Sequence, residues 1–408
     1  MLKVTFLIAQ SENLLLVSRS EFFMIKLNRE FFTSDIIVLK NSESGLSEFI
    51  NSNTIPWDNV TEIKLKGKYY YSFSKRIVHN IDYVKSQRNI YDYFSNVIPL
   101  NNNSFAYKKE TCYLDYLRPH IGNYFFLKID IASFFHSIKE SYVRKLFYNY
   151  INDEFLDNDK KCSLIDALIK LTSIDIPSES KNISYVNKRV FPIGFSSSPI
   201  ISEIYFRPID VLLMKLCSDF ELTYTRYADD ILISGGINNK YIANNWDFIY
   251  NRIFEIFSYY KLKINTRKTI NKKKCLSING YVLESMYYDN RLLFSELRIS
   301  NFKLKKINKA LFYLEENTYI KNETIKYVME KVFNSKFKKD KFKYTITQSF
   351  IDRHYVFSLT NKMRGFRAYL LSFIIYDRKY MILQKETKDK YLKIIGRIEL
   401  IIDRLLKK

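Results

Sequence analysis

Residues 222–235 constrain the fold of this chain more than any other segment. Two runs of β-forming residues flank a short turn that carries two adjacent acids, Asp229 and Asp230. The pattern predicts an antiparallel hairpin with both carboxylates at its tip. Because neighbouring side chains in a strand or tight turn point to different sides, Asp229 and Asp230 cannot both be core residues. Alone, an Asp-Asp pair is most often an exposed acidic turn, so a second observation is needed.

A third acid supplies that observation. Residues 124–135 form an apolar strand that ends at Asp130 and leads into a small residue and two aromatic residues. An acid at the end of a buried strand is costly unless it is paired, protonated or bound to a cation. Metal-assisted phosphoryl transfer uses carboxylates from separate elements to hold two cations about 3.5–4 Å apart. Asp130, Asp229 and Asp230 therefore indicate a candidate site for that chemistry.

The segments around these acids resemble motifs A and C of reverse transcriptases, and Tyr227–Asp230 is the characteristic Tyr-Ala-Asp-Asp tetrapeptide of that family's palm. The resemblance extends in order over about residues 64–283. It implies an α+β fold, a right-hand polymerase with fingers, an antiparallel-sheet palm and a helical thumb. It also implies an RNA-directed DNA polymerase, which adds dNTPs to a 3′ hydroxyl. Two Mg²⁺ ions, or Mn²⁺, would be held by Asp130, Asp229, Asp230 and the backbone carbonyl of Ile131.

Residues 191–199 resemble motif B, the loop and helix that contact the incoming base pair and the template. Gly194 would allow a strained backbone or a close approach, although a plain turn into a core helix is the local alternative. Ile193 and Glu203 replace the family's usual Gln and Asn, which weakens the expectation of the usual side-chain contact to the nucleotide. With Asp210, these residues resemble the unknown-group and abortive-infection enzymes of bacteria. That branch implies antiphage defence and a dedicated structured non-coding RNA as template.

Three further roles follow from the same resemblance. Phe135 lies five residues beyond Asp130, where the family's steric gate excludes ribonucleotides; its local alternative is an ordinary core phenylalanine. Lys268 would protonate or steady the departing pyrophosphate, and its alternative is a solvated lysine in a basic turn. Gly280 would let the primer backbone approach closely, and its alternative is a simple hairpin.

Basic residues outside these motifs are expected to contact nucleotide or nucleic acid. Lys75 and Lys108 lie where the family's fingers hold template and triphosphate. A cluster in the C-terminal part is expected to hold phosphates of a duplex or structured RNA. It comprises Lys362, Arg364 and Arg367.

The pattern of the chain suggests three parts: an N-terminal extension at 1–60, fingers and palm at 61–285, and a helical thumb or C-terminal basic domain at 286–408. An amphipathic helix is predicted at about 82–94, and the helical pattern is expected from about Leu292 onward. Two amphipathic helices are predicted in the last part. Residues 302–316 would bury Leu304, Ile307, Leu311 and Leu314, and residues 389–408 would bury Leu392, Ile395, Ile402 and Leu405.

Composition agrees with a polyanionic partner without proving one. The 408 residues carry a formal net charge of +22, but an AT-rich genome would also inflate lysine. Four cysteines lie far apart without a CxxC pair, which predicts reduced thiols. The first 17 residues are too interrupted for a signal peptide, and there is no uncharged apolar run long enough to span a membrane. A cytoplasmic protein without membrane contact is therefore expected.

Two other functions stay open. Template-independent or protein-primed DNA synthesis would use the same fold and acids. A non-catalytic RNA-binding scaffold would need neither metals nor nucleotides, but the intact set argues against it: Asp130, Phe135, Asp229, Asp230 and Lys268. The expected partners are an RNA template, dNTPs and the DNA product, and homo-oligomerisation is left open.

Overall fold

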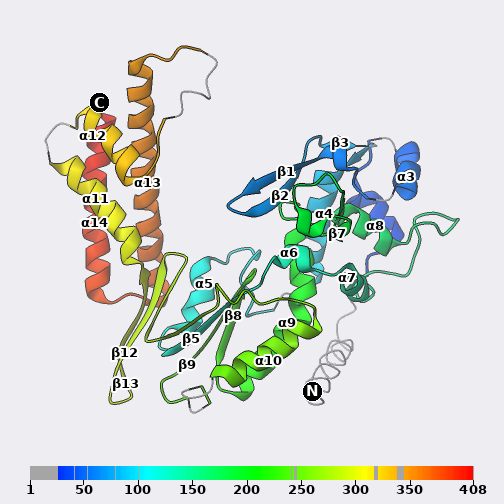
Figure 1. Cartoon of the computed structure of the whole chain (residues 1–408), viewed down its shortest axis with the longest axis horizontal. Helices are drawn as coiled ribbons and strands as arrows, with labels where there is room; N and C mark the ends of the chain where they lie inside the picture. Colours follow the sequence, from blue (N-terminus) through cyan, green and yellow to red (C-terminus); the bar gives the residue numbers. More distant parts are fainter. Residues whose placement is uncertain are drawn as a thin grey trace. The chain divides into compact units, whose positions relative to one another are not determined.

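The computed structural model describes residues 26–40, 42–52, 54–78, 80–99, 101–239, 241–242, 246–316, 320–337 and 344–407 (Figure 1). The chain divides into two compact units. The first contains Met1–Tyr116, Leu127–Gly235 and Asn239–Asn271, and the second contains Leu117–Phe126, Gly236–Asn238 and Lys272–Lys408. Residues 1–25 of the expected N-terminal extension lie outside the described residues. The division into extension, fingers with palm, and thumb stays a prediction.

A four-stranded sheet carries the candidate site, in the order β10 (Ile270–Lys273), β5 (Phe125–Asp130), β9 (Asp230–Gly235) and β8 (Thr223–Tyr227). The predicted hairpin is confirmed, because β8 and β9 pair antiparallel with Tyr227 opposite Asp230. All six residues of β5 are buried, as its continuous apolar run suggests. Two helices accompany the sheet: α9 (Ser198–Asp219) packs against β8 and against α10 (Trp246–Tyr259).

A second part of the first unit is built on the hairpin of β1 (Val60–Leu65) and β2 (Lys68–Phe73). The short pair β3 (Ile77–Val78) and β4 (Ile81–Asp82) leads into α4 (Tyr83–Val97), which confirms the helix predicted from about residue 82. Asp82 caps α4 by accepting a hydrogen bond from the backbone N–H of Lys85, which starts the helix at that point.

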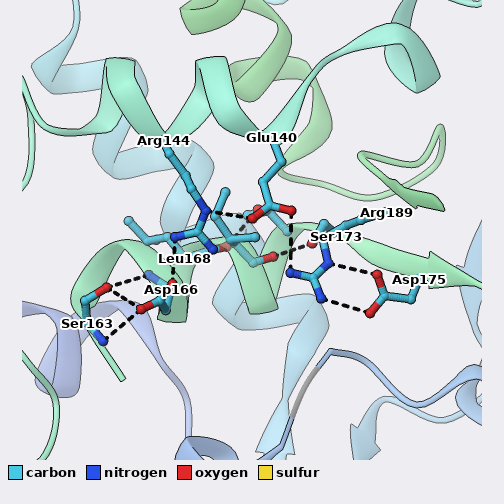
Figure 2. Close-up of polar contacts among 10 residues, drawn as sticks. Glu140, Arg144, Ser163, Asp166, Leu168, Ser173, Asp175 and Arg189 are labelled. Atoms are coloured by element: carbon cyan, nitrogen blue, oxygen red, sulfur yellow. Dashed lines mark hydrogen bonds and ion pairs between the residues drawn. The ribbon is translucent and has the colours of Figure 1, made fainter. Parts of the chain in front are cut away.

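An ion network joins four further elements: α7 (Glu140–Phe147), α8 (Leu164–Thr172), β6 (Ile174–Ile176) and β7 (Lys188–Val190). Figure 2 shows Arg144 between Glu140 and Asp166, at 2.6 Å from each carboxylate. Arg189 reaches Asp175 at 2.8 Å and Glu140 at 3.5 Å. Because these side chains are all partly exposed, each ion pair of the network adds little to stability.

The C-terminal segment of the second unit contains an antiparallel sheet of β11 (Cys275–Ile278), β12 (Tyr281–Tyr288) and β13 (Arg291–Ile299). The expectation of helix from about Leu292 is therefore wrong, because β13 extends to Ile299. The cause is local: Asp289 and Asn290 both adopt positive φ, and this two-residue turn returns the chain onto β12. The helices follow: α11 (Asn301–Glu315), α12 (Asn322–Tyr327), the π-helical turn η6 (Val328–Val332), α13 (Gln348–Tyr380) and α14 (Lys385–Leu406).

Both predicted amphipathic helices of this unit are present. On α11 the four expected residues Leu304, Ile307, Leu311 and Leu314 are buried. On α14 one expectation is wrong, because Leu392 is 46% exposed while Tyr391 is fully buried. Tyr391 takes the core position because its hydroxyl accepts a hydrogen bond from the backbone N–H of Ile299, and the buried stripe then continues through Ile394, Ile395, Ile398, Ile401, Ile402 and Leu405.

The remaining elements are short. None of the helices in the described part of the chain combines the length and the apolar character needed to cross a membrane. The mixture of helices with antiparallel strands confirms the expected α+β class.

The remaining helices of the described residues are α2 (Arg29–Phe31), η2 (Phe32–Ile36), α3 (Ser42–Asn51), η3 (Trp57–Asn59), α5 (Tyr113–Leu117), η4 (Arg118–His120), α6 (Phe134–Ser137) and η5 (Ile183–Tyr185).

Candidate active site

Adjacent strands bring the three acids together. Asp130 is the last residue of β5, and Asp229 and Asp230 lie at the turn into the neighbouring strand β9. The backbone N–H of Ile131 donates to the Asp229 carbonyl at 3.4 Å, which joins the two segments directly behind the acids. Ile131 also forms a bridge with Ile264, and its carbonyl as a metal ligand stays a prediction.

Each of the three carboxylates lies beside a lysine. Lys268 is 3.4 Å from Asp130, Lys68 is 3.6 Å from Asp229, and Lys128 is 2.6 Å from Asp230. The pairs differ in burial: the side chains of Lys68 and Lys268 are about half exposed, at 52% and 53%, whereas Lys128 is 10% exposed. Two of the ammonium groups can therefore move toward a ligand, and the third is fixed.

The donor set suits a hard divalent cation. Carboxylate oxygens are the ligands that Mg²⁺ prefers, and Asp130, Asp229 and Asp230 supply them from two neighbouring strands. Burial raises the pKa of Asp229, and Asp230 and Asp130 add to this rise while Lys68 opposes it. A cation would relieve that accumulation of negative charge. Among the described residues, no three Asp, Glu, His or Cys side chains already surround a common point, so these carboxylates would turn to bind it.

Asn265 is a neighbour of Asp130 that the sequence did not indicate. Its side-chain amide donates to Asp130 Oδ2 at 3.0 Å, and its backbone N–H donates to the Asp130 carbonyl at 2.8 Å. The backbone N–H of Lys268 in turn donates to the Asn265 carbonyl. The loop that carries Lys268 is thus attached to the end of β5, which places the predicted proton donor beside Asp130.

Phe135 and Gly194 occupy different environments. Phe135 is partly exposed on α6, whereas its neighbour Phe134 is 3% exposed and packs on Phe206. The core position is thus taken by Phe134, which leaves Phe135 available for the predicted gate. Gly194 adopts φ +111°, and a Cβ there would collide with the backbone carbonyl of Tyr71. Glycine is therefore required at position 194 because strand β2 of the same chain approaches its backbone closely.

Lys75 and Lys108, the two lysines expected in the fingers, do not lie beside the three aspartates. Lys75 is exposed between β2 and β3. Lys108 is half-buried, its ammonium donates to the Asn101 carbonyl, and burial lowers its pKa. Lys68, at the start of β2, reaches Asp229 instead. The sequence could not single out Lys68, because Lys64 and Lys66 precede it in the same hairpin.

In the second unit, Gly280 lies in the β11–β12 turn at φ +85°, and a Cβ there would collide with the side chain of Lys303. That ammonium lies over the rings of Tyr281 and Tyr369 at 4.7 and 4.8 Å from their centroids. Burial lowers the pKa of Lys303. The positive φ favours glycine at this position, whereas the flexible end of the Lys303 side chain could shift aside, and a contact to a primer stays a prediction.

The basic cluster Lys362, Arg364 and Arg367 lies on α13. Arg364 and Arg367 are three residues apart and so share a face, while Lys362 projects from the other side of the helix. Arg367 forms an ion pair with Glu399 at 2.6 Å, and Lys362 lies over the ring of Phe333. The three residues therefore do not form one continuous surface.

Several known proteins are similar to this chain. A relative from Escherichia coli, the retron Ec86 reverse transcriptase, is 27% identical over 166 residues, which is 41% of this chain and 44% of the relative. The retron Ec73 reverse transcriptase of the same species is 28% identical over 34% of this chain and 41% of its own length. The retron Mx65 reverse transcriptase of Myxococcus xanthus is 32% identical over 29% and 27%. The chain thus spans less than half the length of these relatives.

A telomerase from Candida albicans, solved with a fragment of telomeric RNA, aligns over 93% of this chain and 67% of its own at 12% identity, with a TM-score of 0.42. A family model described as reverse transcriptase (RNA-dependent DNA polymerase) matches residues 68–283, which is more than half of the 408 residues. This match confirms the polymerase fold expected from the motifs. The chain belongs to the reverse transcriptase family.

Proposed function

We propose that this protein is an RNA-directed DNA polymerase that adds dNTPs to a 3′ hydroxyl by two-metal phosphoryl transfer. The observation that carries the proposal is the meeting of Asp130, Asp229 and Asp230 at the ends of β5 and of the β8–β9 hairpin. Two divalent cations held by these carboxylates would lower the pKa of the attacking hydroxyl and stabilise the leaving pyrophosphate. Family membership of residues 68–283 supports the assignment.

The lysines around the acids give the site its further chemistry. Lys68 and Lys268 are about half exposed and lie 3.6 and 3.4 Å from their carboxylates, so each can turn toward a triphosphate, and the bound cations would then compensate the buried charge of Asp130. Lys268 would then donate a proton to the departing pyrophosphate, and Lys68 would neutralise its charge from β2. Phe135 would close the site against a sugar 2′ hydroxyl, since a rigid ring there clashes with a ribonucleotide.

The template is proposed to be RNA, with DNA as product. The net charge of +22 supports a polyanionic partner, and the retron relatives are reverse transcriptases by name. A role in bacterial antiphage defence with a dedicated structured RNA is a further proposal. It is supported by Ile193, Glu203 and Asp210, the residues that resemble the abortive-infection branch.

Primer extension by the purified chain tests the proposal. An RNA template with an annealed DNA primer, labelled dNTPs and Mg²⁺ should give product of template-directed sequence. Product that also forms without template would favour template-independent synthesis. Tight RNA binding without any incorporation, in Mg²⁺ or Mn²⁺, would favour the scaffold. Sequencing the nucleic acid that copurifies with the protein would identify the template.

A further inference from the structure

Arg226 is a fully buried cation directly behind the active-site turn. It lies on β8, three residues before Asp229, and its side chain is 0% exposed. A buried guanidinium is costly unless all its donors are used. Here they are: the side chain makes paired hydrogen bonds of 2.8 to 2.9 Å to each of two carboxylates, Glu203 and Asp210.

The two carboxylates come from one helix and are themselves held. Glu203 and Asp210 lie seven residues apart on α9, which places them two turns apart on the same face. The Ser104 hydroxyl donates to Glu203 at 2.8 Å, and the Tyr224 hydroxyl donates to Asp210. The guanidinium also lies over the ring of Phe206 at 4.5 Å from its centroid. Arg226 therefore has one geometry available to it.

The remaining donor of Arg226 points to the turn that carries the acids. Its Nη1 donates to the backbone carbonyl of Ala228 at 3.2 Å. Ala228 adopts the left-handed conformation, φ +55°, which a residue with a Cβ rarely adopts without support. Ala228 and Asp229 are the two residues of the turn between the paired Tyr227 and Asp230. The hydrogen bond to Ala228 thus supports the backbone conformation that aims the Asp229 carboxylate.

We propose that Arg226 is a positioning residue for the active-site turn, and that Glu203 and Asp210 act through it. The inference rests on the proposed function, because it assumes that Asp229 holds a cation. It gives Glu203 a role that differs from the family's nucleotide contact: Glu203 is 3% exposed and both its oxygens accept from Arg226, so it cannot also reach a nucleotide.

The same network includes the loop before α5. The backbone N–H of Arg226 donates to the Asn103 carbonyl at 2.8 Å, and the N–H of Phe105 donates to the Arg226 carbonyl at 2.9 Å. We call Arg226 with Glu203 and Asp210 the clamp. Together with the hydrogen bond from the Ser104 hydroxyl to Glu203, these two backbone hydrogen bonds attach the loop to the clamp at three points. Ser104 offers a mild perturbation of the clamp, because its removal leaves both ion pairs in place.

Binding of Mn²⁺ to the whole purified chain without nucleotide, followed by electron paramagnetic resonance, tests the proposal. Glu203→Gln keeps the shape of the side chain but removes one of the two negative charges that hold Arg226. It should weaken Mn²⁺ binding about tenfold, the usual effect of losing a residue that orients a metal ligand. Ser104→Ala should weaken it less. Glu140→Gln is the matched control, because Glu140 also contacts two arginines, Arg144 and Arg189.

Asp229→Asn separates this inference from the proposed function. If Asp229→Asn loses Mn²⁺ affinity while Glu203→Gln binds Mn²⁺ as the wild type does, the positioning role is overturned. If Asp229→Asn itself retains full affinity, the proposed metal site is wrong and the positioning role falls with it. Should Glu203→Gln fail to fold in circular dichroism, Ser104→Ala decides: unchanged affinity contradicts the proposal, and a reduced affinity with a wild-type melting curve supports it.

Discussion

Lys128 Nζ lies 2.6 Å from Asp230 Oδ1, and the two side chains are only 10% and 15% exposed. Removing one partner of a buried pair leaves an uncompensated charge, so Lys128→Met should lower the free energy of unfolding by about 3 kcal/mol. The loss should be smaller in excess Mg²⁺ than in EDTA, because a cation beside Asp230 replaces the missing positive charge. Urea unfolding in both buffers measures the difference.

Lys161→Met is the control for this substitution. Lys161 pairs with Asp159 at 3.0 Å, but the side chains are 59% and 72% exposed, so its removal should leave stability nearly unchanged in either buffer. An equal loss for Lys128→Met with and without Mg²⁺ would show that no cation binds near Asp230.

Acid should destabilise the fold through His136. Burial lowers the pKa of His136 from about 6.5 to about 4, and its Nε2 is buried without a hydrogen-bond partner among the described residues. The folded state therefore favours the neutral ring. The contribution of His136 to the free energy of unfolding is fully present above pH 6.5 and is lost as the pH falls toward 4. At pH 4 the loss from this residue should be roughly 3 kcal/mol.

His136→Phe removes the titrating ring and should flatten this part of the stability profile. Chemical unfolding at several values between pH 7 and pH 4 measures it. His354 is exposed, so His354→Phe should keep the wild-type profile. A profile of His136→Phe that is as steep as the wild type's would mean that the ring is protonated in the fold.

The local features of this fold could be predicted from the sequence, because they depend on neighbouring residues. The acid-tipped hairpin, the helix after Asp82 and the buried face of residues 302–316 are examples. The prediction was wrong where the pairing of two strands decides between a helix and a strand. The run Leu292–Phe294 suits a helix or a strand, and the turn at Asp289 and Asn290 settles it as β13.

Contacts between residues that lie far apart in the sequence could not be predicted from the sequence. Lys68 and Asn265 are polar residues in polar surroundings, and nothing nearby indicates that they lie beside Asp229 and Asp130. Arg226 did leave a signal. It and the two acids of α9 are charges within apolar segments, and buried charges must be paired.

Phe135→Ala should admit ribonucleotides. The ring is partly exposed while Phe134 takes the core position, so truncation should open space beside the sugar at little cost in stability. A gain of roughly tenfold or more in rNTP use relative to dNTP use is expected, since a steric clash contributes a few kcal/mol of discrimination. Single-nucleotide incorporation by the wild type and the variant measures the ratio. An unchanged ratio with activity preserved would place the gate elsewhere.

The face of α13 that carries Arg364 and Arg367 should contact phosphates. Arg364→Gln with Arg367→Gln should weaken RNA binding and flatten its salt dependence by roughly one unit per lost contact. Lys362→Gln is the matched control, because Lys362 lies on the other side of the helix and covers Phe333. RNA affinity measured from low to high salt provides the slopes. Equal slopes for the double variant and the wild type would remove this face from the interface.

RNA-templated dNTP incorporation by Asp229→Asn tests whether the three carboxylates carry the polymerase reaction. Asp229 is the better choice than Asp230, because neutralising Asp230 would leave Lys128 buried and unpaired. Since burial raises the pKa of Asp229, the asparagine should not destabilise the fold, and RNA binding should persist. The rate should fall about 1000-fold or more, because a proposed cation ligand is lost. Incorporation at near the wild-type rate would contradict this role of the carboxylates.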